Sequence, residues 1–174
     1  MKPKHLPRLL SAMAVLLVLS LSLLPALPVL AADTGPRNAG AASSVSSGQA
    51  GAVWTNTGNI TEAGWPYATA TVLESGTTDY LFASSYGFNI PSGARIDGIE
   101  VSISRRAAKN IVRDDRVSLV KGGIILATNK AYKAGLWPTN VYAESRTYGG
   151  AADLWETNWT AEEVNAPDFG VALS

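Results

Sequence analysis

The segment from Arg95 to Arg106, RIDGIEVSISRR, decides the fold class because its apolar and polar residues alternate. Side chains of a β-strand point in turn to opposite faces of the sheet, so this pattern predicts a strand with one buried and one solvated face. The apolar face carries Ile99, Val101 and Ile103, and the polar face carries Glu100, Ser102 and Ser104. Helical periodicity is nearly absent from the rest of the chain, so the other elements are expected to be strands as well.

Short apolar segments of β-type residues recur between glycine and proline turns. Further strands are predicted at residues 69–74, 80–83, 88–90, 116–120, 124–128, 140–148 and 169–173. The predicted strands at residues 116–120 and 124–128 flank Gly122 and Gly123, which suit the positive φ angles of a tight hairpin turn. Seven or eight short strands predict an all-β fold, an antiparallel β-sandwich of the jelly-roll kind.

One short helical turn is expected near residues 161–165. Thr160 and Glu163 form a capping box, in which each side chain can bond the backbone N–H of the other residue. Pro167 follows and cannot continue a helix. Carboxylates are favoured at a helix N-terminus for electrostatic reasons, so we expect Glu162 and Glu163 to be structural rather than catalytic.

The N-terminus has the order of a secretory signal peptide. Three basic residues within the first eight positions precede an apolar run that ends at Pro25, and small residues follow at Ala31 and Ala32. This order predicts a signal peptide over residues 1–32 and a secreted or cell-surface protein. An uncleaved membrane anchor over residues 9–30 is the alternative, because that run approaches the about 20 residues that span a bilayer.

The remaining chain is predicted to hold one domain. Residues 33–51 are rich in Gly, Ala and Ser and are expected to form a flexible leader, with residues 42–45 as an optional edge strand. Residues 52–174 are the predicted β-sandwich domain.

Composition excludes several functions. The first 32 residues hold three of the 14 basic residues and none of the 14 acidic ones, which leaves 11 basic against 14 acidic residues, a net charge of −3. We therefore expect no nucleic-acid partner and no membrane contact beyond the signal peptide.

His5 is the single histidine and the chain has no cysteine, so Ser-His-Asp catalysis, Cys-His catalysis, common zinc sites and disulfides are excluded after cleavage. Export without cysteine favours a bacterial or archaeal envelope.

An ordered series of short motifs runs along the predicted domain. It consists of Trp54-Thr-Asn, Tyr67-Ala-Thr-Ala70, Tyr86 to Ala94, Ile96 to Val101, Val117 to Gly123, Trp137-Pro-Thr139, Tyr148-Gly-Gly150, Asp153-Leu-Trp155, Trp159-Thr160 and Phe169-Gly-Val171. This series resembles a β-sandwich module of bacterial secreted and surface proteins and of phage structural proteins. The resemblance implies a fold and an extracellular setting and no particular reaction.

The chain departs from that module at two places. The resemblance implies a glycine after Trp155, where this chain has Glu156. It also implies one more strand after the last motif, so the domain is expected to lack its final strand and to be a fragment or to receive that strand from another subunit. The last strand would then have an open edge, which promotes association.

The segment 148–160, YGGAADLWETNWT, holds the candidate ligand-binding residues Asp153, Trp155 and Trp159. In an extended chain all three would share one face and could form a stacking platform for sugar rings. The alternative is that the tryptophans fill the core. The same alternatives apply to Trp54 and Trp137, whereas Trp65, beside Pro66 in a glycine-containing loop, is the best candidate for an exposed ligand-binding aromatic.

Carboxylates leave two further hypotheses open. A glycosidase needs only a facing carboxylate pair, for which Glu100, Glu144, Asp153 and Glu156 qualify by type. A structural calcium site would use Asp97, Asp114, Asp115 or Asp153, although no loop has EF-hand spacing. The run from Arg105 to Arg116 mixes both charge signs and is expected to be a solvated loop.

The sequence thus favours an exported, non-catalytic β-sandwich module with a structural or adhesive role, no cofactor and other protein subunits as partners. A carbohydrate-binding module that docks an extracellular glycan with loop aromatics is the first alternative. A glycoside-active enzyme is the second.

Overall fold

The structure is a computed structural model that describes residues 33–73 and 75–174. The predicted signal peptide, residues 1–32, lies outside the described residues. Residues 33–174 form a compact unit of their own. Within the described ranges, no helix has the length and apolarity needed to cross a membrane.

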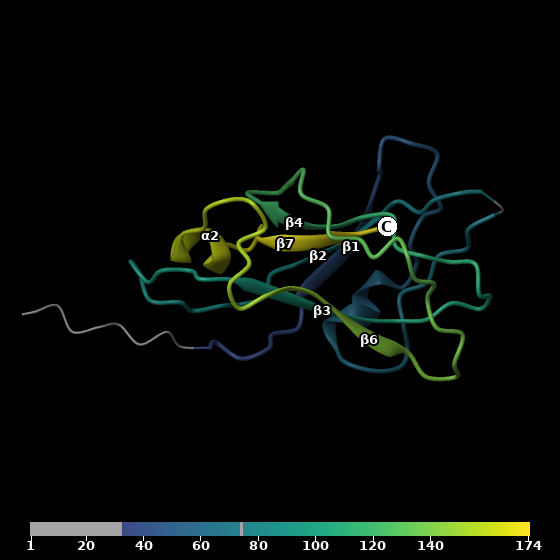
Figure 1. The fold of residues 1–174 in the computed structure, drawn as a ribbon, viewed down its shortest axis with the longest axis horizontal. Helices are drawn as coiled ribbons and strands as arrows, with labels where there is room; N and C mark the ends of the chain where they lie inside the picture. The colour runs from purple at the N-terminus through teal and green to yellow at the C-terminus, as the bar shows by residue number, and fades with distance from the viewer. Residues whose placement is uncertain (1–32, 74) are drawn as a thin grey trace, which may run out of the picture. The chain divides into compact units, whose positions relative to one another are not determined.

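The strands of the described residues form two antiparallel sheets (Figure 1). The larger sheet has the order β1-β2-β7-β4-β5, with β1 at Ala41–Val45, β2 at Tyr80–Ser84, β7 at Gly170–Leu173, β4 at Val117–Lys121 and β5 at Ile124–Ile125. The smaller sheet pairs β3 (Ile99–Arg105) with β6 (Glu144–Gly150), and the 3-10 helix η2 (Thr57–Thr61) and α2 (Ala161–Asn165) complete the elements. The predicted antiparallel β-sandwich class is confirmed.

The hydrophobic core lies between the two sheets. In Figure 1, β3 and β6 run beneath the strands of the five-stranded sheet, and both layers contribute to one buried cluster. Leu119 and Val171 come from the larger sheet, while Val101 and Tyr148 come from the smaller one. The alternation predicted for Ile99 to Ser104 is confirmed at its centre, because Val101 is buried whereas Glu100 and Ser102 are exposed.

Most of the predicted strands are present. The glycine hairpin joins β4 to β5, Lys121 pairs with Ile124, and Gly122 and Gly123 have φ angles of +57° and +75°. The optional edge strand also forms, because β1 pairs with β2 inside the segment predicted to be a flexible leader. Residues 41–45 of the predicted leader are therefore a strand of the larger sheet.

Two predicted strands are wrong. In the described part of residues 69–74, Thr69 makes only an isolated bridge to Thr55. Residues 88–90 have no strand partner, because the Asn165 side chain takes that place: its Oδ1 accepts the Ile90 N–H at 2.9 Å and its Nδ2 donates to the Ile90 carbonyl at 2.8 Å. A side-chain amide can satisfy the backbone where a neighbouring strand would otherwise do so.

The predicted open edge at the last strand is also wrong. β7 pairs with β2 on one side and with β4 on the other, so both of its edges are satisfied. All four of its residues are buried, as expected for a central strand that is covered on both faces. Sequence order misled here because β7 inserts between two strands that precede it in the chain.

The helical turn forms as predicted. Thr160 caps α2, its Oγ1 accepting the Glu163 N–H at 3.2 Å, while the Glu163 carboxylate accepts the Thr160 N–H at 3.0 Å. α2 lies at one end of the sandwich (Figure 1) and leads the chain into β7.

Candidate functional site

Most of the predicted ligand-binding tryptophans are core residues. Trp137, Trp155 and Trp159 are 8%, 1% and 7% exposed, and Trp54 is 8% exposed. Each indole N–H has an acceptor: the Trp155 indole donates to the Ile99 carbonyl at 2.8 Å and the Trp159 indole to the Leu154 carbonyl at 3.1 Å. A ring that is buried on both faces cannot stack on a sugar, so these residues follow the core alternative.

The shared face predicted for Asp153, Trp155 and Trp159 does not form. The segment turns instead of extending, and Trp155 and Glu156 both adopt left-handed backbone angles, with φ of +56° and +57°. Gly149 permits this turn, because a Cβ there would collide with the indole of Trp155 and with the Ile99 carbonyl. The Tyr-Gly-Gly and Asp-Leu-Trp motifs therefore build one packing unit.

Asp153 supports that unit. Its Oδ1 accepts the Trp155 N–H at 2.8 Å, and its Oδ2 forms an ion pair with Lys130 at 2.8 Å. The bond from Lys130, followed by the one from the Trp155 backbone, lowers the pKa of Asp153. Lys130 also lies 5.4 Å from the centroid of the Trp155 ring, so it links the carboxylate to the indole that the turn buries.

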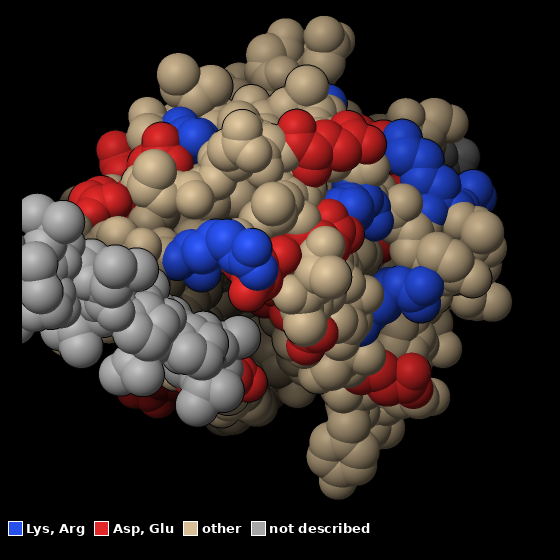
Figure 2. All heavy atoms as spheres, turned by 60° about the vertical axis from the view of Figure 1, so that its left-hand side comes forward, with Lys and Arg blue, Asp and Glu red and all other residues tan. Residues whose placement is uncertain are grey.

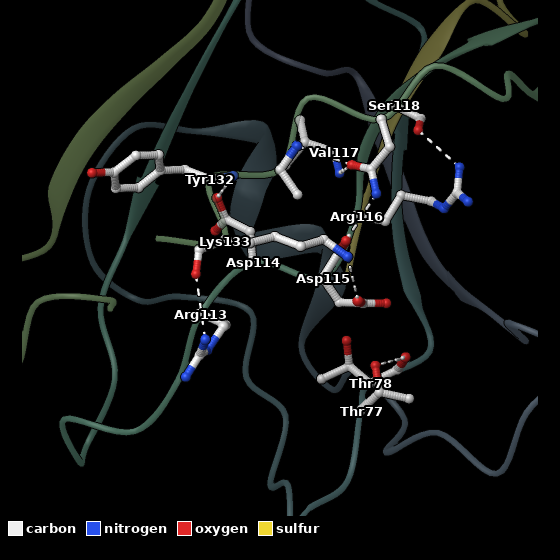
Figure 3. Close-up of polar contacts among 12 residues, drawn as sticks. Thr77, Thr78, Arg113, Asp114, Asp115, Arg116, Val117, Ser118, Tyr132 and Lys133 are labelled. Atoms are coloured by element: carbon white, nitrogen blue, oxygen red, sulfur yellow. Dashed lines mark hydrogen bonds and ion pairs between the residues drawn. The ribbon is translucent and has the colours of Figure 1, made fainter. Parts of the chain in front are cut away.

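A buried polar cluster centres on Asp114, which is fully buried. Figure 3 shows Asp114 beside Tyr132, whose backbone N–H is one of its partners. Its Oδ1 accepts the Trp137 indole N–H at 2.7 Å and lies 3.3 Å from Nε of Arg105. Its Oδ2 accepts the Tyr148 hydroxyl at 2.7 Å and the Tyr132 N–H at 3.0 Å. Arg105 Nε also donates to the Tyr148 hydroxyl at 3.2 Å, which closes the network. Burial and the bond to Asp114 raise the pKa of Tyr148 to about 12.

The prediction that residues 105–116 form a solvated loop is therefore wrong for two residues of this cluster. Arg105 is 7% exposed and Asp114 is 0% exposed. The sequence held one signal for it. Arg105 continues the parity of Ile99, Val101 and Ile103 and so points to the core face of β3. The partner could not be inferred, because Asp114 lies in a loop and no periodicity marks its direction.

The candidate calcium ligands are each engaged with protein groups. The Asp114 oxygens accept two contacts apiece, and Asp153 is bonded as described above. Asp97 pairs with Arg95 at 2.6 Å, and Asp115 pairs with Lys133 at 3.2 Å. In Figure 3, Asp114 points toward the Tyr132 backbone while Asp115 points toward Lys133, so these adjacent acids diverge. Among the described residues, no group of three or more acidic side chains could hold a metal ion.

The register of β3 and β6 separates two of the candidate catalytic carboxylates. Glu144 pairs with Arg105, five residues along β3 from Glu100. At about 3.4 Å per residue this separates their backbones by about 17 Å, whereas the carboxylates of a glycosidase pair lie about 5 to 9.5 Å apart. Asp153 is bonded to Lys130, and Glu156 accepts the Thr128 hydroxyl at 3.0 Å.

Trp65 lies where an exposed ligand-binding aromatic is expected. It is 84% exposed, and it borders a hollow of about 280 Å³ whose other walls include Asn59, Thr61 and Glu62. Asn59 is fixed by its own bond from Nδ2 to the Tyr67 carbonyl at 3.1 Å. The loop thus presents one apolar ring beside polar side chains.

No family model, curated protein or solved structure matches the chain in comparisons with known proteins. The resemblance to the secreted and phage β-sandwich module therefore stays a prediction.

Proposed function

We propose that the chain is an exported, non-catalytic β-sandwich module with a structural or adhesive role in an extracellular or cell-surface assembly. One observation carries the non-catalytic part of the proposal: Asp153, Trp155 and Trp159 of segment 148–160, the part most suggestive of a site, are engaged in a turn and in the core. The structural or adhesive part rests on the β-sandwich fold and on the resemblance given by the ordered motifs. Export rests on the order of residues 1–32.

The surface charges favour partners other than nucleic acid. On the face drawn in Figure 2, Lys and Arg are interspersed with Asp and Glu, and no extended field of one sign is present on it. A nucleic-acid site normally needs a basic stripe, because phosphate contacts supply most of its affinity. Proteins and glycans are bound through hydrogen bonds and apolar contacts, which a mixed surface allows.

Retention on envelope material tests this proposal. Residues 33–174 would be mixed with insoluble bacterial cell-wall polysaccharide and sedimented, and both the bound fraction and the release of new reducing ends would be measured. An adhesive module sediments with the polysaccharide and releases no reducing ends, while a structural module self-associates in sedimentation velocity. Release of reducing ends that Glu144→Gln abolishes would establish the glycoside-active alternative instead. A chain that neither sediments nor associates would contradict both roles.

Carbohydrate binding through Trp65 is the second candidate function. It is favoured by the 84% exposure of Trp65 and by the polar hollow beside it. Exposed aromatic rings with nearby hydrogen-bonding groups are typical of sugar platforms. A soluble glycan should protect one tryptophan of the parent chain from acrylamide. In a direct binding assay it should still bind Trp65→Phe, which keeps an aromatic ring, and should lose its binding to Trp65→Ala. Equal glycan binding by Trp65→Ala would remove this candidate.

A further inference from the structure

A second, larger hollow lies at the end of the β3 and β6 pair. Its volume is about 430 Å³, within the range of about 300 to 1,000 Å³ of small-molecule sites. Its walls come from the end of β3, the start of β6 and the loops that follow β3 and precede β6. The lining includes Arg105, Asn110, Thr139, Glu144, Ser145 and Arg146. None of them lines the hollow beside Trp65.

The walls of this hollow are fixed by backbone hydrogen bonds. The Ala107 N–H donates to the Pro138 carbonyl at 2.8 Å, and the Trp137 N–H donates to the Val112 carbonyl at 2.7 Å. Arg106 Nη1 also donates to the Val141 carbonyl at 2.6 Å. The two loops are therefore tied to each other, and the hollow is largely formed before any ligand arrives.

Arg105 is held in this hollow with donors to spare. Its side chain is 6% exposed, and Nε is taken up by Asp114 and by the Tyr148 hydroxyl. Its guanidinium carbon lies 5.6 Å from the centroid of the Trp137 ring. In the described part of the chain, the hydrogen bonds of Arg105 involve Nε alone, so both terminal amino groups keep N–H donors for a ligand. A guanidinium fixed in this way loses little entropy when it binds.

A second guanidinium lines the same hollow. The guanidinium carbon of Arg146 lies 3.4 Å from the centroid of the Tyr132 ring, which holds the group by stacking. Glu144 is the acidic residue in the lining, and its carboxylate accepts a bond from Nδ2 of Asn140. Asp114 balances the charge of Arg105, so what favours a carboxylate here is the geometry of the donors: the fork of an arginine matches the two oxygens of a carboxylate.

We propose that this hollow binds the carboxylate of an acidic sugar, with Arg105 and Arg146 as the anion-binding residues. The amide and hydroxyl side chains of Asn110, Thr139 and Ser145 supply the donors and acceptors that sugar hydroxyls need. The inference deepens the proposed adhesive role and rests on it, because it names the surface component to which the module would adhere.

Chemical-shift mapping tests the proposal on residues 33–174. Trigalacturonate is the acidic probe, and its fully methyl-esterified form is the matched neutral probe. We expect trigalacturonate to shift amide signals of the lining residues and the ester to shift them at least about tenfold more weakly, because a charged bidentate contact is lost. Binding should also weaken as salt rises.

Two variants separate binding from folding. Arg146→Gln removes a guanidinium that stacks on the Tyr132 ring and keeps both partners of the buried Arg105–Asp114 pair, and it should weaken trigalacturonate binding by about tenfold or more. Arg95→Gln removes an arginine whose side chain is 87% exposed and which lies outside the hollow, and it should leave binding unchanged.

Three results would overturn the proposal: no shifts with millimolar trigalacturonate, equal binding of the ester, or tighter binding of an oligoglutamate peptide than of the sugar. Shifts confined to the Trp65 loop would also move the site away from this hollow. If trigalacturonate fails while the chain still sediments with cell-wall material without cleaving it, the acidic-sugar site is wrong and the adhesive role stands.

Discussion

Asp114 should contribute far more to stability than Asp115, the residue next to it. Asp114 is fully buried and receives four donors, whereas the Asp115 side chain is 64% exposed and pairs with Lys133 alone. Asp114→Asn keeps the shape of the side chain and removes its charge. Arg105 then stays buried without a counter-charge, and the new amide NH₂ faces groups that are themselves donors.

The expected cost of Asp114→Asn is about 3–5 kcal/mol, the range for breaking a buried ion pair from one side. This is a large share of the about 5–15 kcal/mol that stabilises a typical domain. Arg105→Met should cost less, because Asp114 keeps the N–H and O–H donors of Trp137, Tyr148 and Tyr132. Asp115→Asn should cost about 0–1 kcal/mol, as exposed ion pairs do.

Urea unfolding followed by tryptophan emission measures these free energies, because four buried indoles become exposed. Coincident transitions by circular dichroism would establish that two-state analysis applies. The reasoning is refuted if Asp114→Asn and Asp115→Asn cost the same within error. It is refuted as well if Arg105→Met is more costly than Asp114→Asn.

Four further outcomes follow from the geometry. Tyr148 has a pKa of about 12 in the folded chain against 10.0 when unperturbed. The free energy of unfolding that this raised pKa contributes is full below pH 10 and is lost as pH rises through 12. Tyr148→Phe should therefore lose less stability between pH 10 and 12 than the parent chain does in alkaline unfolding curves. Glu156 has a φ of +57°, and Glu156→Gly should be more stable than Glu156→Ala by about 1 kcal/mol in urea, since only alanine retains the left-handed strain; equal stabilities would contradict this account of the turn. Thr160→Ala should lose about 1 kcal/mol with the capping bond, and Thr160→Ser should not; thermal melts of both variants decide. Trp65→Ala should change the free energy of unfolding by less than about 0.5 kcal/mol while removing the most readily quenched part of the emission; a larger loss would mean that Trp65 packs against the domain.

Local patterns were sufficient for the fold class and for several elements. Alternation at residues 99–104 predicted β3, two adjacent glycines predicted the hairpin of β4 and β5, and the pairing of Thr160 with Glu163 predicted α2. Each of these depends on interactions between residues that are close in the chain. Periodicity, turn angles and capping bonds can therefore be read without knowing what packs against them.

The candidate sites could not be predicted in the same way. Whether a tryptophan is core or platform depends on what covers its two faces, and Trp65 differs from Trp155 only in that respect. The ion pair of Arg105 and Asp114 joins the end of β3 to a loop residue nine positions later. Loop residues follow no periodic pattern, so the sequence does not show which way the Asp114 side chain points. The hollow at Arg146 likewise arises because β3 and β6 pair across about 40 intervening residues.

The sequence by itself determined the all-β class, the exclusion of histidine and cysteine chemistry after the predicted cleavage, and the turns that punctuate the strands. These properties follow from composition and from contacts over a few residues. Only the tertiary structure decided that β7 lies in the middle of its sheet, that four tryptophans are buried and that an acid and an arginine meet in the core. Those outcomes depend on contacts between distant segments, whose gain in burial and hydrogen bonding exists only once the chain has folded.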